Sequence, residues 1–301
     1  MSDSVDIFRL VTAAVEPIVS TGPDPYAETP CPDWNYAQLL GHLIGGDRAF
    51  VGILSGETAP PDRPRMVPDA DQPPPTARDY RQWSHRLAHL LDQPEILSGV
   101  HDIPVGRLPG AQVVVLRSVE HLLHGWDLAK AAGASPADLE PVATTLMQPA
   151  QTLLAAVGDQ TLGDRRPFAP AVDVDAQADP LTRFVALFGR DPGWEPDPVA
   201  GYGKLKERFA GLADVELPDG TRRGYGADGM RVDNQVFACT YRDRLMIKLP
   251  EDEVNTLISE GLGLPLAKPG QRPMREWVLV PFDGAAGARA ERAYAFVRGR
   301  G

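Results

Sequence analysis

Hydrophobic residues recur at helical spacing through the first two-thirds of the chain. A helix is predicted wherever apolar side chains return every three or four residues between proline-rich breaks. The first such stretch carries Val5, Phe8, Val11, Val15 and Ile18. The segment 56–75 is rich in proline and is expected to be an extended surface loop, and 101–110 is expected to be a short extended connection. The pattern predicts helices at about 4–20, 35–54, 76–97, 111–133, 136–157 and 179–189.

The periodicity changes after residues 189–203, where prolines and glycines crowd together. The later segments alternate or run as short β-rich stretches between turn residues, which indicates strands mixed with helices. We therefore predict a multidomain chain, with an all-α four-helix bundle at 1–195 and a small α+β domain at 201–301. The elements predicted in the second domain are strands at 235–241, 244–249 and 276–281 and helices at 251–261 and about 284–298.

The composition is that of a soluble globular protein, with 43% hydrophobic and 24% charged residues. Apolar runs are too short for a membrane span, and MSDSVDIFRL lacks the basic-then-apolar pattern of a secretion signal. Cys31 and Cys239 lie far apart, which favours reduced thiols over a disulfide framework. These features predict a cytoplasmic protein without a membrane partner.

The formal charge of −11 lies mainly in the first 200 residues, which hold 14 Lys and Arg against 27 Asp and Glu. Such an acidic segment disfavours binding to a phosphate backbone. The remaining residues are close to neutral, and the basic pair Arg222 and Arg223 does not make a stripe. We therefore expect no nucleic-acid partner.

The segment EHLLH carries the most informative chemistry of the chain. Glu120 and His124 are four residues apart, so both side chains project from one face of a helix. An ionised carboxylate turned into a core costs several kcal/mol unless it is paired, and a divalent metal ion is an economical partner. On a solvated face the same spacing would have no meaning. The residues that share this predicted buried stripe are Val113, Leu116, Glu120, Leu123, His124 and Asp127.

A third ligand must come from another element, and His42 is the candidate because it lies in the helical stretch NYAQLLGHLIGGDRAFVGIL. Two imidazoles and one carboxylate suit Zn²⁺, while Fe²⁺, Ni²⁺ and Mn²⁺ are chemically reasonable as well. Three protein ligands leave one position open, as in catalytic zinc sites. The small residues Gly45, Gly46 and Ala49 lie on the same face. They either leave room for a substrate or make tight helix contacts.

Two further residues are candidates for support of this site. Asp127 lies three residues after His124 and could accept a hydrogen bond that fixes the tautomer of a ligand imidazole. It could equally pair with Arg117 or cap the end of the helix. His121 points about 100° away from Glu120. It is therefore assigned to a structural or surface role, with a fallback role as a ligand.

Three segments together resemble a known family. TPCPDWNYAQLLGHL, RSVEHLLHGWDLAKAAG and DPLTRFVALFGRDPGW follow one another over about residues 1–195. They resemble the DinB superfamily, and within it the mycothiol-dependent maleylpyruvate isomerase-like branch of actinobacteria. The resemblance implies a four-helix bundle with zinc at His42, Glu120 and His124, where a low-molecular-weight thiol such as mycothiol binds as a thiolate. The glutamate at the second ligand position points to the thiol-dependent branch, because the classical pattern has three histidines.

The segment RRGYGADGMRVDNQVFACTYRDRLMIKLP and the later REWVLVP resemble the MmcQ/YjbR-like and TfoX N-terminal-like group, over about residues 201–283. This domain replaces the usual C-terminal domain of the isomerases, so the electrophilic substrate stays unassigned. Tyr225, Lys248 and Trp277 could form a binding surface there. Packing in the core or at a strand edge is the favoured interpretation of these residues.

These observations favour an enzyme in which a metal-activated thiolate attacks a small electrophile, either as an S-transferase or as a cis–trans isomerase. Two alternatives stay open. One is a binding or regulatory protein whose metal is structural, and the other is a hydrolase that acts through metal-bound water. The expected partners are a small thiol and its electrophile. The oligomeric state is not set by the sequence, although bundle proteins often form homodimers.

Overall fold

The computed structural model describes residues 3–21, 25, 27–31, 34–57, 75–157, 168–221, 226–242, 244–267 and 272–300. These residues form ten α-helices, one short 3-10 helix and eight strands. The chain divides into two compact units, Met1–Pro25 with Thr29–Glu195 and Tyr26–Glu28 with Pro196–Gly301. The prediction of a helical N-terminal part followed by a sheet-containing part is confirmed. Most of the loop predicted at 56–75 lies outside the described residues.

The first unit is built from helices whose ends follow local sequence signals. Asn35 and Thr76 each begin a helix with a capping box, in which the side chain accepts a hydrogen bond from the third backbone N–H. The longest helix, α5, ends at Gly133, which adopts a positive φ of 65° that favours glycine. The helices are α1 (Asp3–Ser20), α2 (Tyr36–Leu54), α3 (Ala77–Leu91), α4 (Pro94–Ser98), α5 (Gly110–Ala132), α6 (Glu140–Val157) and α7 (Pro180–Leu187).

Three stretches of the first unit differ from the prediction. The helix predicted at 76–97 is interrupted before Pro94, because proline lacks an N–H and disfavours a helical residue before it. The segment predicted as an extended connection is a hairpin of β1 (Val100–Ile103) and β2 (Gly106–Pro109). The helix predicted at 136–157 opens as a 3-10 turn, Ala137–Leu139, before α6 begins.

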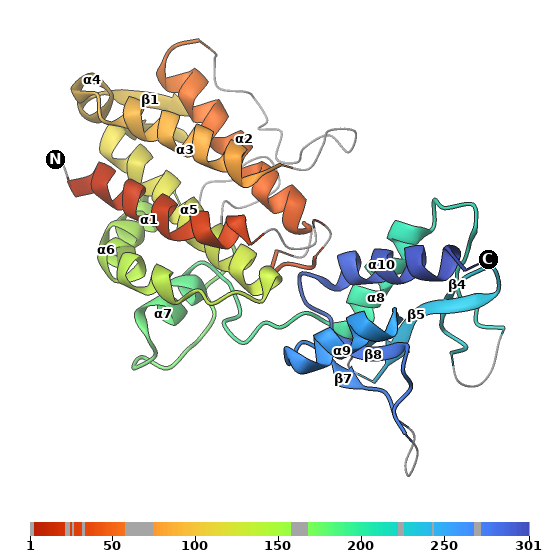
Figure 1. Ribbon diagram of the computed structural model, residues 1–301. Coiled ribbons are helices and arrows are strands. Elements are labelled where there is room, and N and C mark those ends of the chain that lie inside the picture. The colour runs from red at the N-terminus through yellow and green to blue at the C-terminus, as the bar shows by residue number, and fades with distance from the viewer. Residues whose placement is uncertain are drawn as a thin grey trace. The chain divides into compact units, whose positions relative to one another are not determined.

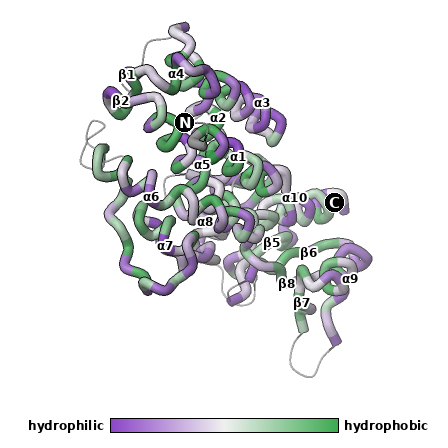
Figure 2. The backbone as a smooth tube through the Cα atoms, turned by 90° about the vertical axis from the view of Figure 1, so that its left-hand side faces the viewer, coloured by the Kyte–Doolittle hydropathy of each residue, from purple (hydrophilic) through white to green (hydrophobic). Residues whose placement is uncertain are grey.

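Helix α5 lies at the centre of the first unit. It packs against α1, α2, α4 and α6, while α3 packs against α1 and α2 (Figure 1). At Gly125 the backbone of α5 approaches α1 so closely that an added Cβ would lie 2.4 Å from a methyl group of Val15. The predicted stripe is buried except for Glu120, which is partly exposed, and Arg117, Ser118 and His121 outside the stripe are buried as well. Helix α5 is therefore enclosed on several sides, whereas α3 is mainly hydrophilic and buries one stripe of residues (Figure 2).

A buried polar network joins α2, α3 and α5. The carboxylate of Asp47 is fully buried and accepts a hydrogen bond of 2.8 Å from Nη2 of Arg117. Nε2 of His121 lies 3.0 Å from the same oxygen, and the hydroxyl of Tyr80 lies 2.9 Å from Nδ1 of His121. Burial alone would raise the pKa of Asp47, but the charges and hydrogen bonds of His121 and Arg117 lower it. The surface interpretation of His121 is wrong, since this imidazole is fully buried.

The second unit contains an antiparallel sheet in the order β3-β4-β5-β6-β8-β7. Helix α8 begins inside the segment 189–203, where helical periodicity is absent from the sequence, so no helix was predicted there. The elements are α8 (Pro198–Phe209), β3 (Val215–Glu216), β4 (Met230–Val232), β5 (Gln235–Tyr241), β6 (Arg244–Lys248), α9 (Glu251–Ser259), β7 (Leu264–Pro265), β8 (Trp277–Pro281) and α10 (Ala286–Arg298).

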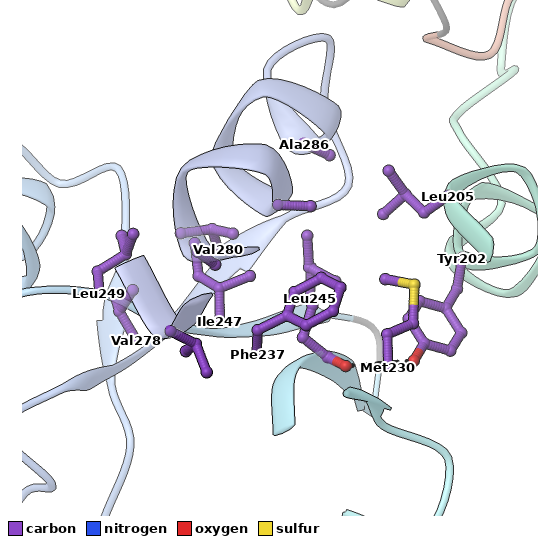
Figure 3. Packing of buried hydrophobic residues seen from close by; sticks show 14 of the residues in the cluster. Tyr202, Leu205, Met230, Phe237, Leu245, Ile247, Leu249, Val278, Val280 and Ala286 are labelled. Carbon is purple, nitrogen blue, oxygen red and sulfur yellow. Dashed lines mark hydrogen bonds between the residues drawn. The ribbon is translucent and has the colours of Figure 1, made fainter. Parts of the chain in front are cut away.

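The core of the second unit lies between the sheet and its helices. Phe237, Ile247 and Val280 from the central strands belong to one buried cluster with Tyr202 of α8 and Ala286 of α10 (Figure 3). Cys239, Met246 and Leu279 from the same three strands form a smaller buried cluster with Leu266. Within the described residues, no helix combines the length and apolar character needed to cross a membrane.

The three residues considered for a binding surface have different surroundings. Trp277 packs, partly buried, against the smaller cluster, which agrees with the packing interpretation. Lys248 places Nζ 3.3 Å from Oε1 of Gln235 in an exposed contact. Tyr225 lies outside the described residues. Among the described residues, these contacts do not form a site.

The close approach at Gly125 predicts a stability loss on adding one methyl group. Gly125→Ala should lower the free energy of unfolding by about 1–3 kcal/mol, because the β-branched Val15 is rigid and buried. Gly45→Ala is the matched control, since its new Cβ would have nothing within 4 Å. The control should gain about 0.5–1 kcal/mol from helix propensity. Urea unfolding followed by circular dichroism measures both, and equal stability of the two variants would contradict the packing.

The buried network predicts a larger loss at Asp47. Asp47→Ala leaves Arg117 and His121 buried without their acceptor, which should cost about 3–5 kcal/mol of unfolding free energy. Asp102→Ala is the control, because Asp102 pairs with Arg107 only at 3.9 Å and both side chains are exposed. That exposed pair should contribute less than about 1 kcal/mol. Similar urea midpoints for the two variants would show that the network adds little to stability.

Candidate metal centre

The side chains of His42, Glu120 and His124 converge from α2 and α5. Nε2 of His42 lies 3.2 Å from Oε2 of Glu120, and Nε2 of His124 lies 3.6 Å from the same oxygen. One donor atom from each residue lies within 4.8 Å of the other two. The three side chains are 11%, 20% and 8% exposed, so the group is shielded but reachable from solvent. We call this group the His–Glu–His triad.

The electrostatics of the triad favour a carboxylate between two imidazoles. Burial alone would raise the pKa of Glu120, but hydrogen bonds with His124 and His42 place it well below its ordinary value. Burial lowers the pKa of His42, and nearby positive charges act in the same direction against the opposing effect of Glu120. An ionised carboxylate and a neutral imidazole are the protonation states that ligate a metal. The donor set therefore fits a divalent cation.

His124 is held from its other side by Asp127. Oδ2 of Asp127 lies 3.0 Å from Nδ1 of His124, and the carboxylate is fully buried. A proton on Nδ1 that is donated to Asp127 leaves the lone pair of Nε2 directed toward Glu120. Burial would lower the pKa of His124, but hydrogen bonds to Asp127, Cys31 and Glu120 raise it well above its ordinary value. A cation at Nε2 therefore competes with a proton.

Arg117, the other predicted supporting residue, lies in the Asp47 network. Asp127 pairs instead with Arg190, whose Nε and Nη2 lie 3.0 Å from the two carboxylate oxygens. The pairing of Asp127 with Arg117 is therefore wrong. Burial would raise the pKa of Asp127, but the hydrogen bond from His124 and the charge of Arg190 lower it.

Two residues that were not predicted from the sequence also lie at this site. Arg190 follows α7, and its Nη2 lies 3.2 Å from Sγ of Cys31, a residue in the segment before α2. The same sulfur lies 3.2 Å from Oδ2 of Asp127 and 4.0 Å from Nδ1 of His124. These contacts join residues 63 to 159 positions apart. No periodicity or motif spacing signals contacts of such long range.

Cys31, His124 and Asp127 form a second group whose donor atoms lie within 4.8 Å of one another. We call it the Cys–His–Asp triad. The guanidinium of Arg190 contacts both its sulfur and its carboxylate, so a cation there would face a fixed positive charge. The His–Glu–His triad carries no such contact in the described part of the chain. It is therefore the better candidate for a metal ion.

The surroundings of the His–Glu–His triad include an aromatic wall. The ring of Trp34 lies 4.6 Å from the ring of His42 and 5.9 Å from that of His124, measured between centroids. A Cβ on Gly46 would lie 2.7 Å from Nη1 of Arg117, so this glycine makes a tight helix contact. A Cβ on Gly45 would meet nothing within 4 Å, which leaves space beside the turn after His42.

The part of the chain that carries the His–Glu–His triad is similar to a known protein family. Residues 8–129, which include all three triad residues, match the model of the mycothiol maleylpyruvate isomerase N-terminal domain. An uncharacterized protein of Mycobacterium tuberculosis strain H37Rv is 30% identical over 187 residues, covering 62% of this chain and 92% of the relative. Its counterpart in strain CDC 1551 / Oshkosh gives the same values. No solved structure gives a significant match. The chain belongs to the mycothiol maleylpyruvate isomerase N-terminal domain family, which is DinB-like.

Proposed function

We propose that this chain is a divalent-metal-dependent enzyme that uses a low-molecular-weight thiol, such as mycothiol, on a small electrophilic substrate. The observation that carries the proposal is the convergence of two imidazoles and one ionised carboxylate from α2 and α5. The family match supports mycothiol as the thiol. The reaction would be S-transfer if the thiol stays on the product, or cis–trans isomerisation if it adds and then leaves.

The residues of the site have separate tasks in this proposal. His42, Glu120 and His124 would hold zinc or a similar divalent ion, which when bound lowers the pKa of a coordinated thiol. Asp127 orients the imidazole of His124 through the 3.0 Å contact to Nδ1. Trp34 lies beside both imidazoles, where its ring excludes water from one side of the site.

We also make proposals about the helical bundle, the domain bounds and the cellular location. We propose that α1, α2, α3 and α5 form the four-helix bundle of the DinB superfamily, since each packs against two of the others. We retain the domains 1–195 and 201–301, and the resemblance of 201–283 to MmcQ/YjbR-like or TfoX N-terminal-like domains remains a prediction. We also propose that the protein acts in the cytoplasm on small molecules, without a nucleic-acid or membrane partner.

The metal site predicts about one divalent ion per chain in protein purified without chelator. His124→Ala should lose most of this metal, because the variant removes one of three ligands. His89→Ala is the matched control, since His89 is an exposed histidine of α3. Elemental analysis of the folded variants measures the metal content. Stoichiometric metal in His124→Ala would rule out the triad as the site.

The proposed chemistry predicts metal-dependent consumption of mycothiol with small activated alkenes as electrophiles. Turnover that is lost in His124→Ala and kept in His89→Ala would support the enzyme. Isomerisation of a cis alkene without net loss of thiol would identify the isomerase. Stoichiometric thiol binding without turnover would favour a sensor. Turnover that needs metal but no thiol would favour hydrolysis by metal-bound water. Thiol titration and chromatography of the products distinguish these outcomes.

A further inference from the structure

We infer that Arg190 determines on which side of His124 a metal ion binds. Its guanidinium keeps the ion at the His–Glu–His triad, and its loss would open the Cys–His–Asp triad as a thiolate-containing metal site. Arg190 acts through Asp127 and Cys31, so it is a positioning residue rather than a catalytic one. This inference rests on the proposed metal site and adds a determinant of its ligand chemistry.

The positive charge of Arg190 lies beside the Cys–His–Asp triad. Nη2 of Arg190 lies 3.0 Å from Oδ2 of Asp127 and 3.2 Å from Sγ of Cys31. These are two of the three donor atoms of the Cys–His–Asp triad. The guanidinium remains charged at all relevant pH values, and its side chain is only 15% exposed, so solvent screens it weakly. The guanidinium therefore already supplies the positive charge that a metal ion would bring to the Cys–His–Asp triad.

The two ring nitrogens of His124 face different triads. A neutral imidazole has one N–H and one lone pair, so only one nitrogen can ligate a metal. Nδ1 lies 3.0 Å from Oδ2 of Asp127 and Nε2 lies 3.6 Å from Oε2 of Glu120, so a metal bound at Nε2 would leave Nδ1–H to donate to Asp127. A metal at Nδ1 would move the proton to Nε2, 3.6 Å from Oε2 of Glu120, and would remove His124 from the His–Glu–His triad. The two triads therefore exclude each other.

The two triads differ in the class of metal that they favour. Two imidazoles and a carboxylate suit Zn²⁺ and other divalent ions of intermediate softness. Thiolate, imidazole and carboxylate form a softer set, which shifts preference toward metals with strong sulfur affinity. A metal held by Cys31 would also leave His42 without a role in binding. Arg190 thus keeps the ion between α2 and α5.

Cobalt(II) is a suitable probe because its absorption reports sulfur ligation through a thiolate-to-cobalt charge-transfer band in the near ultraviolet. Full-length protein would be titrated with cobalt(II) as wild type, Arg190→Lys and Arg190→Gln. Wild type and Arg190→Lys should bind cobalt without this band, since both keep the positive charge. Arg190→Gln should bind cobalt with the band. Cys31→Ser in the Arg190→Gln background should abolish the band, which excludes Cys239 as its source.

Substitution of His42 gives a second readout that does not depend on a spectrum. In wild type, His42→Ala should weaken cobalt binding by at least about tenfold, a loss typical of disturbed metal sites. In the Arg190→Gln background the same substitution should leave cobalt affinity nearly unchanged, because His42 is not part of the Cys–His–Asp triad. If Arg190 were merely structural, His42→Ala would weaken cobalt binding to the same extent in the wild-type and Arg190→Gln backgrounds. Isothermal titration calorimetry measures the affinities.

The possible results separate this inference from the proposed function. A Cys31-dependent band in wild type would overturn the inference, and so would Arg190→Gln that binds cobalt without the band. If Arg190→Gln binds cobalt without the band, the inference about Arg190 fails while the proposed metal site still stands. Wild type that binds no cobalt would overturn both. Circular dichroism checks the fold of each variant, and Arg190→Met, which keeps an unbranched apolar stem without the charge, replaces Arg190→Gln if that variant does not fold.

Discussion

The buried carboxylate of Asp47 is the interaction on which the arrangement of the helical unit depends. It is fully buried on α2, and both of its hydrogen-bonding partners, Arg117 and His121, lie on α5. An unpaired charge at such depth costs several kcal/mol, so a shift of α2 along α5 that broke these contacts would be strongly unfavourable. His42 lies five residues before Asp47, and Glu120 directly precedes His121. The network therefore fixes the register that brings the His–Glu–His triad together.

Exposure distinguishes the structural cluster from the candidate site, although both consist of carboxylates and imidazoles. Asp47 and His121 are completely inaccessible, and every polar atom in their contact has a protein partner. Glu120 keeps 20% of its side chain exposed and His42 keeps 11%, so a small molecule can reach them. Low exposure strengthens electrostatic interactions, and residual access allows exchange of ligands. Carboxylates and imidazoles thus stabilise the fold on one face of α5 and remain available for chemistry on a neighbouring face of the same helix.

The sequence predicted those features that depend on local spacing. Glu120 and His124 share a face because they are four residues apart, and the capping signals of α2 and α3 are likewise local. The surface interpretation of His121 was wrong because periodicity assumes one buried face, whereas α5 is enclosed by several helices. Arg190 was missed because its contacts to Asp127 and Cys31 span 63 and 159 residues. Such contacts are set by how the helices pack, which single-sequence patterns do not encode.

The candidate metal centre lies in the helical unit. Its residues, from Cys31 to Arg190, all belong to that unit, and the second unit has its own sheet and its own buried core. The match to the M. tuberculosis relatives covers nearly all of those proteins but only 62% of this chain. More than a third of the chain lies outside this match. His42, Glu120 and His124 all lie within residues 8–129, which match the family model, so we assign the proposed thiol chemistry to the helical unit.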